Sequence, residues 1–141
     1  MTMEVTTSEV VGTATIQIPV TREMLSNILC CAFEGGSNYW IGGAKYTQGK
    51  QSNEPLNEEF YAPKGFVIEL KDAEDGKWFA KKAEEYNYRP LTEESLIQGI
   101  TLYFSKDRGQ YAWKWDDDCS MDADSADQVV QLAVFGEVVF G

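Results

Sequence analysis

Residues 21–36 read TREMLSNILCCAFEGG and carry the clearest secondary-structure signal in the chain. Thr21 stands where a helix N-cap is expected, because its side-chain oxygen can accept a hydrogen bond from a backbone N–H of the first turn. Apolar residues then recur at helical spacing, which predicts a helix with one wide apolar face. They are Met24, Leu25, Ile28, Leu29, Ala32 and Phe33. Gly35 and Gly36 are predicted to end the helix, one of them in the left-handed conformation.

Two further segments show the same periodicity. Thr92 is followed by two glutamates, and acids in the first turn interact favourably with the helix dipole. A helix is therefore predicted to start there and to include residues 96–104. A last helix is predicted to begin at a cap formed by Asp122 or Asp124 and to end at Gly136. Its apolar face consists of Ala126, Val129, Val130, Ala133 and Val134.

Short strands are predicted between the helices, where β-branched and aromatic residues alternate with small or polar ones. They are residues 13–20, residues 66–70, a return strand that starts at residues 78–80 and runs to Tyr86 or Tyr88, and residues 111–115. Pro19 cannot donate to a neighbouring strand, which favours a sheet edge for the first of them. Asp75 and Gly76 form a hairpin-turn signal before the return strand.

Residues 35–64 contain many glycines and few periodic apolar positions, and we predict an irregular connection there. Helices and short strands then combine into an α+β fold. We expect a single α+β domain over residues 1–141, with three amphipathic helices packed on one face of a small, mainly antiparallel sheet. At 141 residues and 43% hydrophobic content, the chain can build one core.

Acidic residues dominate the charge. The chain has 23 Asp and Glu against 12 Lys and Arg, a net charge of −11. Residues 115–141 contain seven acids and no base (−7), against −3 for residues 1–44 and −1 for residues 45–114. A protein with this balance repels phosphate backbones, so we expect no direct binding of nucleic acid.

Catalysis has few candidate groups. The chain contains no histidine, which excludes Ser-His and Cys-His dyads and zinc sites that use histidine. The three cysteines, two of them adjacent, form no disulfide framework. The carboxylate pairs at 58–59, 84–85 and 93–94 are neighbours in sequence, which says nothing about facing geometry. We predict that the chain is not an enzyme and uses no cofactor or metal.

The acidic stretch from residue 116 to residue 127 is the first candidate binding surface. Its members are Asp116, Asp117, Asp118, Asp122, Asp124 and Asp127. Closely spaced carboxylates can stand in for phosphates and accept arginine side chains in bidentate fashion. A calcium loop is an alternative, because oxygen-bearing side chains occupy the ligand positions counted from Asp116. However, Met121 replaces the glycine of position 6 and Asp127 the glutamate of position 12.

The second candidate is the loop that contains Tyr39 and Trp40, directly after the glycine pair. Aromatic residues in such a loop can anchor a partner protein, although they more often fold back onto the core. If the loop is the anchor, removing either ring should abolish binding while the aspartates tolerate substitution. The two candidate surfaces therefore make different predictions.

Two stretches carry a resemblance: AFEGGSNYW at residues 32–40, and DADSADQVVQ at residues 122–131 with FGEVVFG at residues 135–141. Together they resemble a family of small acidic proteins encoded by bacteriophages and mobile elements, mostly of unassigned function. The resemblance covers roughly a third of the chain and carries over no catalytic residue. It implies a phage or prophage origin. Some small acidic phage proteins, anti-CRISPR proteins among them, inhibit host defence nucleases by occupying sites meant for nucleic acid.

These observations predict a non-catalytic, anti-CRISPR-like inhibitor that binds a basic host protein, such as a nucleic-acid-binding nuclease, by nucleic-acid mimicry. The alternative is a protein-binding or structural phage accessory module without charge mimicry. No membrane span is expected, because no apolar run approaches the roughly 18 residues required. No signal peptide is expected either, because residues 1–11 have no basic region followed by an apolar stretch. We therefore expect the cytoplasm of a bacterial host cell. The apolar segment 138–140 and the strand edge at Pro19 each offer a surface for a homodimer.

Overall fold

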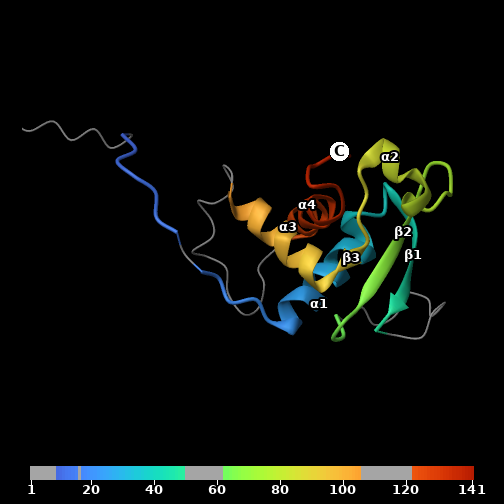
Figure 1. Cartoon of the computed structure of the whole chain (residues 1–141), viewed down its shortest axis with the longest axis horizontal. Coiled ribbons are helices and arrows are strands. Elements are labelled where there is room, and N and C mark those ends of the chain that lie inside the picture. The colour runs from blue at the N-terminus through green and yellow to red at the C-terminus, as the bar shows by residue number, and fades with distance from the viewer. Residues whose placement is uncertain (1–8, 16, 50–61, 106–121) are drawn as a thin grey trace, which may run out of the picture.

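The computed structural model describes residues 9–15, 17–49, 62–105 and 122–141. These residues form an α+β structure with a three-stranded antiparallel sheet in the order β1-β2-β3. The strands are β1 (Ile41–Gln48), β2 (Val67–Asp72) and β3 (Leu91–Thr92). In Figure 1, the helices α1 (Arg22–Cys31), α3 (Glu93–Ser105) and α4 (Ala123–Phe135) lie to one side of β1 and β2, as predicted.

The strand β1 lies in the segment that was predicted to be irregular, so that prediction is wrong for residues 41–48. It pairs with β2 through contacts such as Tyr46 opposite Ile68 and Ala44 opposite Leu70. Its sequence, IGGAKYTQ, has two adjacent glycines and weak β propensity. The strand therefore depends on the partner strand β2, whose alternate residues Ile68, Leu70 and Asp72 are buried.

The helix α1 confirms the strongest prediction. Thr21 caps it through a capping box with Met24: the Met24 N–H donates to Thr21 Oγ1 at 3.1 Å, and the Thr21 N–H donates to Met24 Sδ. The end of the helix differs from the prediction, because neither Gly35 nor Gly36 is left-handed. A π-helical turn, η1 (Ala32–Gly36), follows instead and directs the chain towards α4.

The helices α3 and α4 also begin as predicted. The Thr92 hydroxyl accepts from the Ser95 N–H at 3.1 Å, and the Asp122 carboxylate accepts from the Ser125 N–H at 2.8 Å. Gly136 ends α4 in the left-handed conformation, with φ of 77°. The helix α4 lies at the centre of the helical layer, packed on α1, η1 and α3, and from Ala126 to its end every residue except Gln128 is buried.

Two strand predictions are wrong. Residues 13–15 and 17–20 form no strand, since they lack a partner strand and most of their side chains are exposed. The return strand is reduced to one bridge between Lys71 and Trp78. The chain then enters a 3₁₀ turn, η2 (Phe79–Lys82), and a short helix, α2 (Ala83–Tyr86). The described residues thus contain four α-helices rather than the three predicted, and the predicted strand 111–115 lies outside the described residues.

Aromatic side chains fill the core where α4, η2 and β1 meet. The ring of Trp40, 2% exposed, lies 5.8 Å from Phe79 and 5.5 Å from Phe135, measured between centroids. Phe140 stacks on Trp40 at 5.2 Å with an interplanar angle of 12°. The segment that follows α4 is therefore part of this core, and the loop after α1 is held against it.

Candidate functional site

The carboxylate of Asp127 organises the most polar part of the interior. Its Oδ1 accepts hydrogen bonds from Ser37 Oγ at 2.8 Å and from Trp40 Nε1 at 2.6 Å. Its Oδ2 accepts from the Tyr39 hydroxyl at 2.7 Å and from Gln131 Nε2 at 3.1 Å. Asp127 is 5% exposed, and neutral donors satisfy both of its oxygens. This carboxylate therefore joins the loop 37–40 to α4.

Gln131 extends this network from α4 to the segment after it. Its side chain is fully buried, and its Oε1 accepts from the backbone N–H groups of Val139 and Phe140, each at 2.8 Å. Its Nε2 also lies 3.2 Å from the Phe140 carbonyl and 3.2 Å from the Tyr39 hydroxyl. One glutamine thus connects Asp127, Tyr39 and residues 139–140.

The structure divides the predicted acidic surface. Asp122 and Asp124 are exposed at the N-terminal end of α4, where the helix dipole stabilises them. Asp127 is the exception: its carboxylate is buried, accepts hydrogen bonds from protein donors and is not available to a partner on this surface. The other three predicted residues, Asp116, Asp117 and Asp118, lie outside the described residues.

The two aromatic candidates have different positions. Trp40 is buried, which agrees with the alternative that the aromatic residues of this loop fold back onto the core. Its ring therefore cannot contact a partner directly. Tyr39 is 54% exposed while its hydroxyl turns inward to Asp127. Tyr39 is thus an exposed ring held in a fixed orientation, which suits an interface anchor.

The calcium alternative loses Asp127 as a ligand, and one oxygen of Asp122 is already used. Asp122 Oδ1 caps α4, and both oxygens of Asp127 accept protein donors. In the described parts of the chain, no three Cys, Asp or Glu side chains come together as a metal site requires. Cys119 and the rest of the loop lie outside the described residues.

Tyr39 should make the protein sensitive to alkaline pH. Partial burial and the hydrogen bond to Asp127 raise the pKa of Tyr39 to about 12 from the ordinary value of 10. The neutral phenol is favoured in the folded state, so its stabilising effect is complete below pH 10 and is lost as the pH rises towards 12. We expect the difference in unfolding free energy between the wild type and Tyr39→Phe to shrink over this range. Urea titrations at a series of pH values measure it, and a constant difference would contradict the expectation.

The thiol of Cys30 offers no nucleophile. Burial and a hydrogen bond with Glu34 raise its pKa to about 11, so it stays protonated at neutral pH. The neighbouring Cys31 is half-buried as well. The neighbouring Glu34 is acidic, whereas a reactive cysteine needs electropositive surroundings, so the site of Cys30 disfavours a thiolate.

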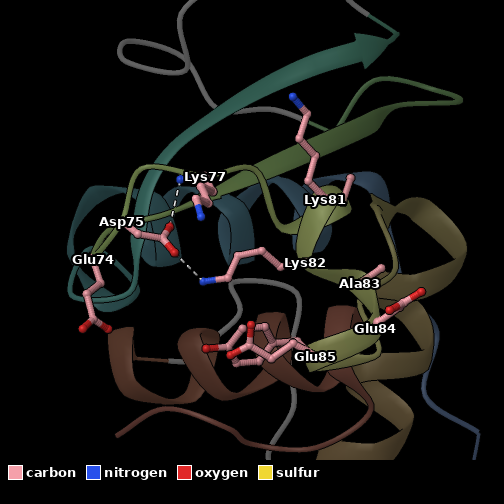
Figure 2. A pocket seen from close by; sticks show the side chains of 10 residues that line it. Glu74, Asp75, Lys77, Lys81, Lys82, Ala83, Glu84 and Glu85 are labelled. Carbon is pink, nitrogen blue, oxygen red and sulfur yellow. Dashed lines mark hydrogen bonds and ion pairs between the residues drawn. The ribbon is translucent and has the colours of Figure 1, made fainter.

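A cavity of about 820 Å³ lies between the turn at residues 73–77 and the helical segment 79–86 (Figure 2). Figure 2 shows the Lys82 ammonium directed at Asp75; their N···O distance is 2.8 Å, and Asp72 lies 2.5 Å from the same ammonium. Both carboxylates raise the pKa of Lys82, and Lys82 in turn lowers that of Asp75. Lys82 therefore connects the turn to the helical segment 79–86. Two carboxylates already neutralise its positive charge, so it is a poor binding group for an anion.

The predicted carboxylate pairs give no catalytic arrangement among the described residues. Glu84 and Glu85 line the open cavity, whereas Glu93 forms an ion pair with Arg22 at 2.7 Å. The pair at 58–59 lies outside the described residues. Whether the chain is an enzyme stays a prediction from sequence.

Sequence reasoning missed the roles of Ser37 and Gln131. The available signal was the pair Asp127 and Gln131, four residues apart on the apolar side of the last helix. A polar pair in that position indicates a buried hydrogen-bond network, because an unpaired polar group there is costly. Its partners lie about 90 residues away in sequence, as the bond from Ser37 to Asp127 shows, and sequence alone does not identify them.

Within the described residues, no helix combines the length and apolar character that crossing a membrane requires. No family model matches the chain, and neither a curated protein nor a solved structure matches it significantly. The resemblance to small acidic phage proteins therefore stays a prediction.

Proposed function

We propose that this chain is a non-catalytic binding protein that uses its acidic surface to engage a basic host protein. The observation that carries the proposal is the charge distribution: residues 115–141 contain no base and six acids besides the buried Asp127, in a chain of net charge −11. Such a surface attracts a groove lined with lysine and arginine and accelerates association with it.

Nucleic-acid-binding nucleases of host defence are the partners that this chemistry fits best. Their grooves are shaped for phosphates, and exposed carboxylates can take the place of phosphates in charge-assisted hydrogen bonds. The proposed activity is therefore anti-CRISPR-like inhibition by nucleic-acid mimicry, in the cytoplasm of a bacterial cell. Asp122 and Asp124 are the described residues assigned to this contact; Asp116, Asp117 and Asp118 complete the set by sequence.

The buried network supports this assignment by fixing the start of α4. Asp127 lies one helical turn beyond Ala123 and is bonded to three residues of the loop after α1. This attachment restricts the motion of the exposed carboxylates before a partner arrives. A surface ordered in advance loses less conformational entropy on binding.

Neutralising Asp122 and Asp124 together is expected to reduce binding about tenfold at low salt, because charges at an interface control steering and salt dependence. The double variant Asp122→Asn and Asp124→Asn suits the test, since asparagine caps a helix as well as aspartate does. The matched control is Glu84→Gln with Glu85→Gln, which removes two adjacent exposed charges on α2.

The measurement is capture of host proteins on the immobilised full chain at about 50 mM and about 300 mM salt. The captured protein is identified, and DNA or RNA is added as a competitor. Binding that weakens with salt, yields to nucleic acid and depends on the α4 pair rather than the α2 pair supports the proposal. Binding that is indifferent to salt and to both pairs contradicts it.

Tyr39 carries the second candidate, a protein-binding module without charge mimicry. The exposed ring is held by its hydroxyl bond to Asp127, which is the geometry of an anchor residue. In the same capture assay, Tyr39→Ala should then abolish binding while the double aspartate variant retains it. Tyr39→Phe keeps the ring and separates the loss of the anchor from the loss of the hydrogen bond.

A further inference from the structure

Tyr39, Asp124 and Val139 come from three different segments and meet along one side of α4. Within this helix, Asp124, Asp127 and Gln131 follow one another at spacings of three and four residues, so their side chains share a face. The Tyr39 hydroxyl donates to Asp127 at 2.7 Å and lies 3.2 Å from Gln131 Nε2. Gln131 Oε1 in turn accepts from the Val139 N–H at 2.8 Å. The hydroxyl end of Tyr39 therefore lies one helical turn from Asp124 and next to the segment that contains Val139.

Exposed apolar area gathers at the same place. Tyr39 is 54% exposed, Val138 42% and Val139 37%. Of the large hydrophobic residues described after residue 20, only these three and Ile97 on α3 are exposed to this extent. An aromatic ring with aliphatic neighbours on the surface is typical of a protein contact, because such side chains dominate the energetics of interfaces.

The charge at this place is negative and lacks a compensating cation. Residues 23–44, which contain Tyr39, and residues 115–141, which contain Asp124, have no Lys and no Arg. Within the described parts of the chain, no basic side chain forms an ion pair with Asp124. After burial and the bond to Asp127, the charge of Asp124 also raises the pKa of Tyr39, which places the two side chains within electrostatic reach of each other.

An exposed ring beside such a carboxylate fits the side chain of arginine. The guanidinium group is planar, stacks on aromatic faces and donates two parallel hydrogen bonds to a carboxylate. Its aliphatic stem can cover apolar neighbours such as Val138 and Val139. Lysine carries the same charge on a compact, strongly hydrated ammonium that fits a ring less well.

We propose that Tyr39 and Asp124 form one arginine-binding site for the partner protein. The ring of Tyr39 stacks on the partner's guanidinium, and the carboxylate of Asp124 accepts its hydrogen bonds. The bond between the Tyr39 hydroxyl and Asp127 orients the ring before the partner arrives, which lowers the entropy lost on binding.

This inference rests on the proposed binding of a basic protein, and it makes the acidic surface and Tyr39 parts of one interface. Charge mimicry alone requires positive charge on the partner and is indifferent to whether lysine or arginine carries it. A module without charge mimicry requires Tyr39 and tolerates a neutral residue at 124. An arginine site requires both side chains and prefers arginine to lysine at equal charge. The three models therefore predict different results in one experiment.

The test compares two short fluorescent peptides by anisotropy, with the full chain at about 50 mM salt. In one peptide glycine alternates with arginine, and in the other lysine replaces every arginine. The wild type should bind the arginine peptide about threefold more tightly than the lysine peptide, as a cation–π contact at an exposed site provides. Tyr39→Leu keeps apolar volume without an aromatic face and should bring the two affinities together. Tyr39→Phe keeps the ring and should keep the preference.

Asp124→Asn should weaken binding of the arginine peptide about threefold, because it removes the charge that pairs with the guanidinium. Glu94→Gln is the matched control, since Glu94 is exposed and is the second residue of α3, as Asp124 is of α4. Ile97→Ala is the control for an exposed apolar side chain. Both controls should bind both peptides as the wild type does. Tyr39→Leu and Asp124→Asn together should cost less than their separate effects combined, because both act on the same guanidinium.

A preference for arginine that disappears in Tyr39→Leu, weakens in Asp124→Asn and persists in both controls supports the proposal. Equal binding of the two peptides by the wild type overturns it, as does a preference that survives Tyr39→Leu or an absence of binding to either peptide. If Tyr39→Leu does not fold, the wild-type preference and the comparison of Asp124→Asn with Glu94→Gln still decide the outcome. Capture of a host protein that depends on salt and on the acids, together with equal binding of the two peptides, would remove the arginine site and leave the proposed function standing.

Discussion

Replacement of Asp127 by alanine is expected to lower the free energy of unfolding by about 4 kcal/mol. The carboxylate accepts from Ser37, Tyr39, Trp40 and Gln131, and the substitution leaves these donors without their acceptor. Each hydrogen bond to a charged group contributes about 1.5–3 kcal/mol, and the relief of burying a charge offsets part of that sum.

Urea unfolding of the two proteins, followed by circular dichroism, measures the effect. Asp124→Ala is the matched control, because it removes an exposed carboxylate of the same helix and should cost less than about 1 kcal/mol. Ser37→Ala removes one donor to Asp127 and should cost about 1 kcal/mol. Equal stability of the Asp127 and Asp124 variants would show that the network contributes nothing.

A substitution of Gly36 by alanine is expected to cost about 3 kcal/mol, at the upper end of typical overpacking. A Cβ atom at this position would lie 2.3 Å from the Ala123 carbonyl oxygen and 3.2 Å from the Cys31 carbonyl oxygen. Both are backbone atoms that cannot rotate away, so η1 and the start of α4 must separate. That movement would also strain the bond between Ser37 and Asp127.

The neighbouring glycine provides the control for this prediction. A Cβ atom on Gly35 would meet nothing within 4 Å, and its φ of 179° is extended backbone that other residues adopt. Gly35→Ala should therefore stay within about 1 kcal/mol of the wild type in the same urea titration. If both variants are equally destabilised, the cause is the backbone of the turn and not the approach of α4.

These two predictions concern the same junction, between η1 and the first turns of α4. The junction brings Asp122 and Asp124 to the surface while it withdraws Asp127 into the core. The anionic surface is consequently smaller than the sequence indicates. In the proposed binding of a basic protein, Asp127 contributes indirectly, because it connects α4 to the loop 37–40. A loss of binding in Asp127→Ala should therefore be compared with the loss of unfolding free energy in the same variant.

The sequence predicted α1, α3 and α4 because each carries its own start signal and a periodic apolar face. Thr21, Thr92 and Asp122 cap helices by bonds within three residues, which a local pattern contains in full. The strand β2 was predicted for a similar reason, since its β-branched and aliphatic residues alternate over one short run. Elements of this kind can be predicted from sequence, because the interactions that define them join residues close together along the chain.

The strand β1, the short η2 and α2, and the candidate site depend on contacts between distant residues. Ile41–Gln48 becomes a strand through its pairing with β2, against weak propensity, and residues 79–86 form helical turns where a return strand was expected. The two aromatic residues predicted to share a loop differ in burial: the ring of Tyr39 is exposed, whereas that of Trp40 lies in the core.

The sequence by itself determined the α+β class, the positions of the three long helices and the concentration of acidic residues in the last fifth of the chain. Only the tertiary structure decided which of those acids lie at the surface and that Gln131 binds the backbone of residues 139–140. The physical reason is that charge and periodicity are properties of a chain segment. Burial of a carboxylate, by contrast, requires donors that folding brings from elsewhere, as Ser37, Tyr39 and Trp40 are brought to Asp127.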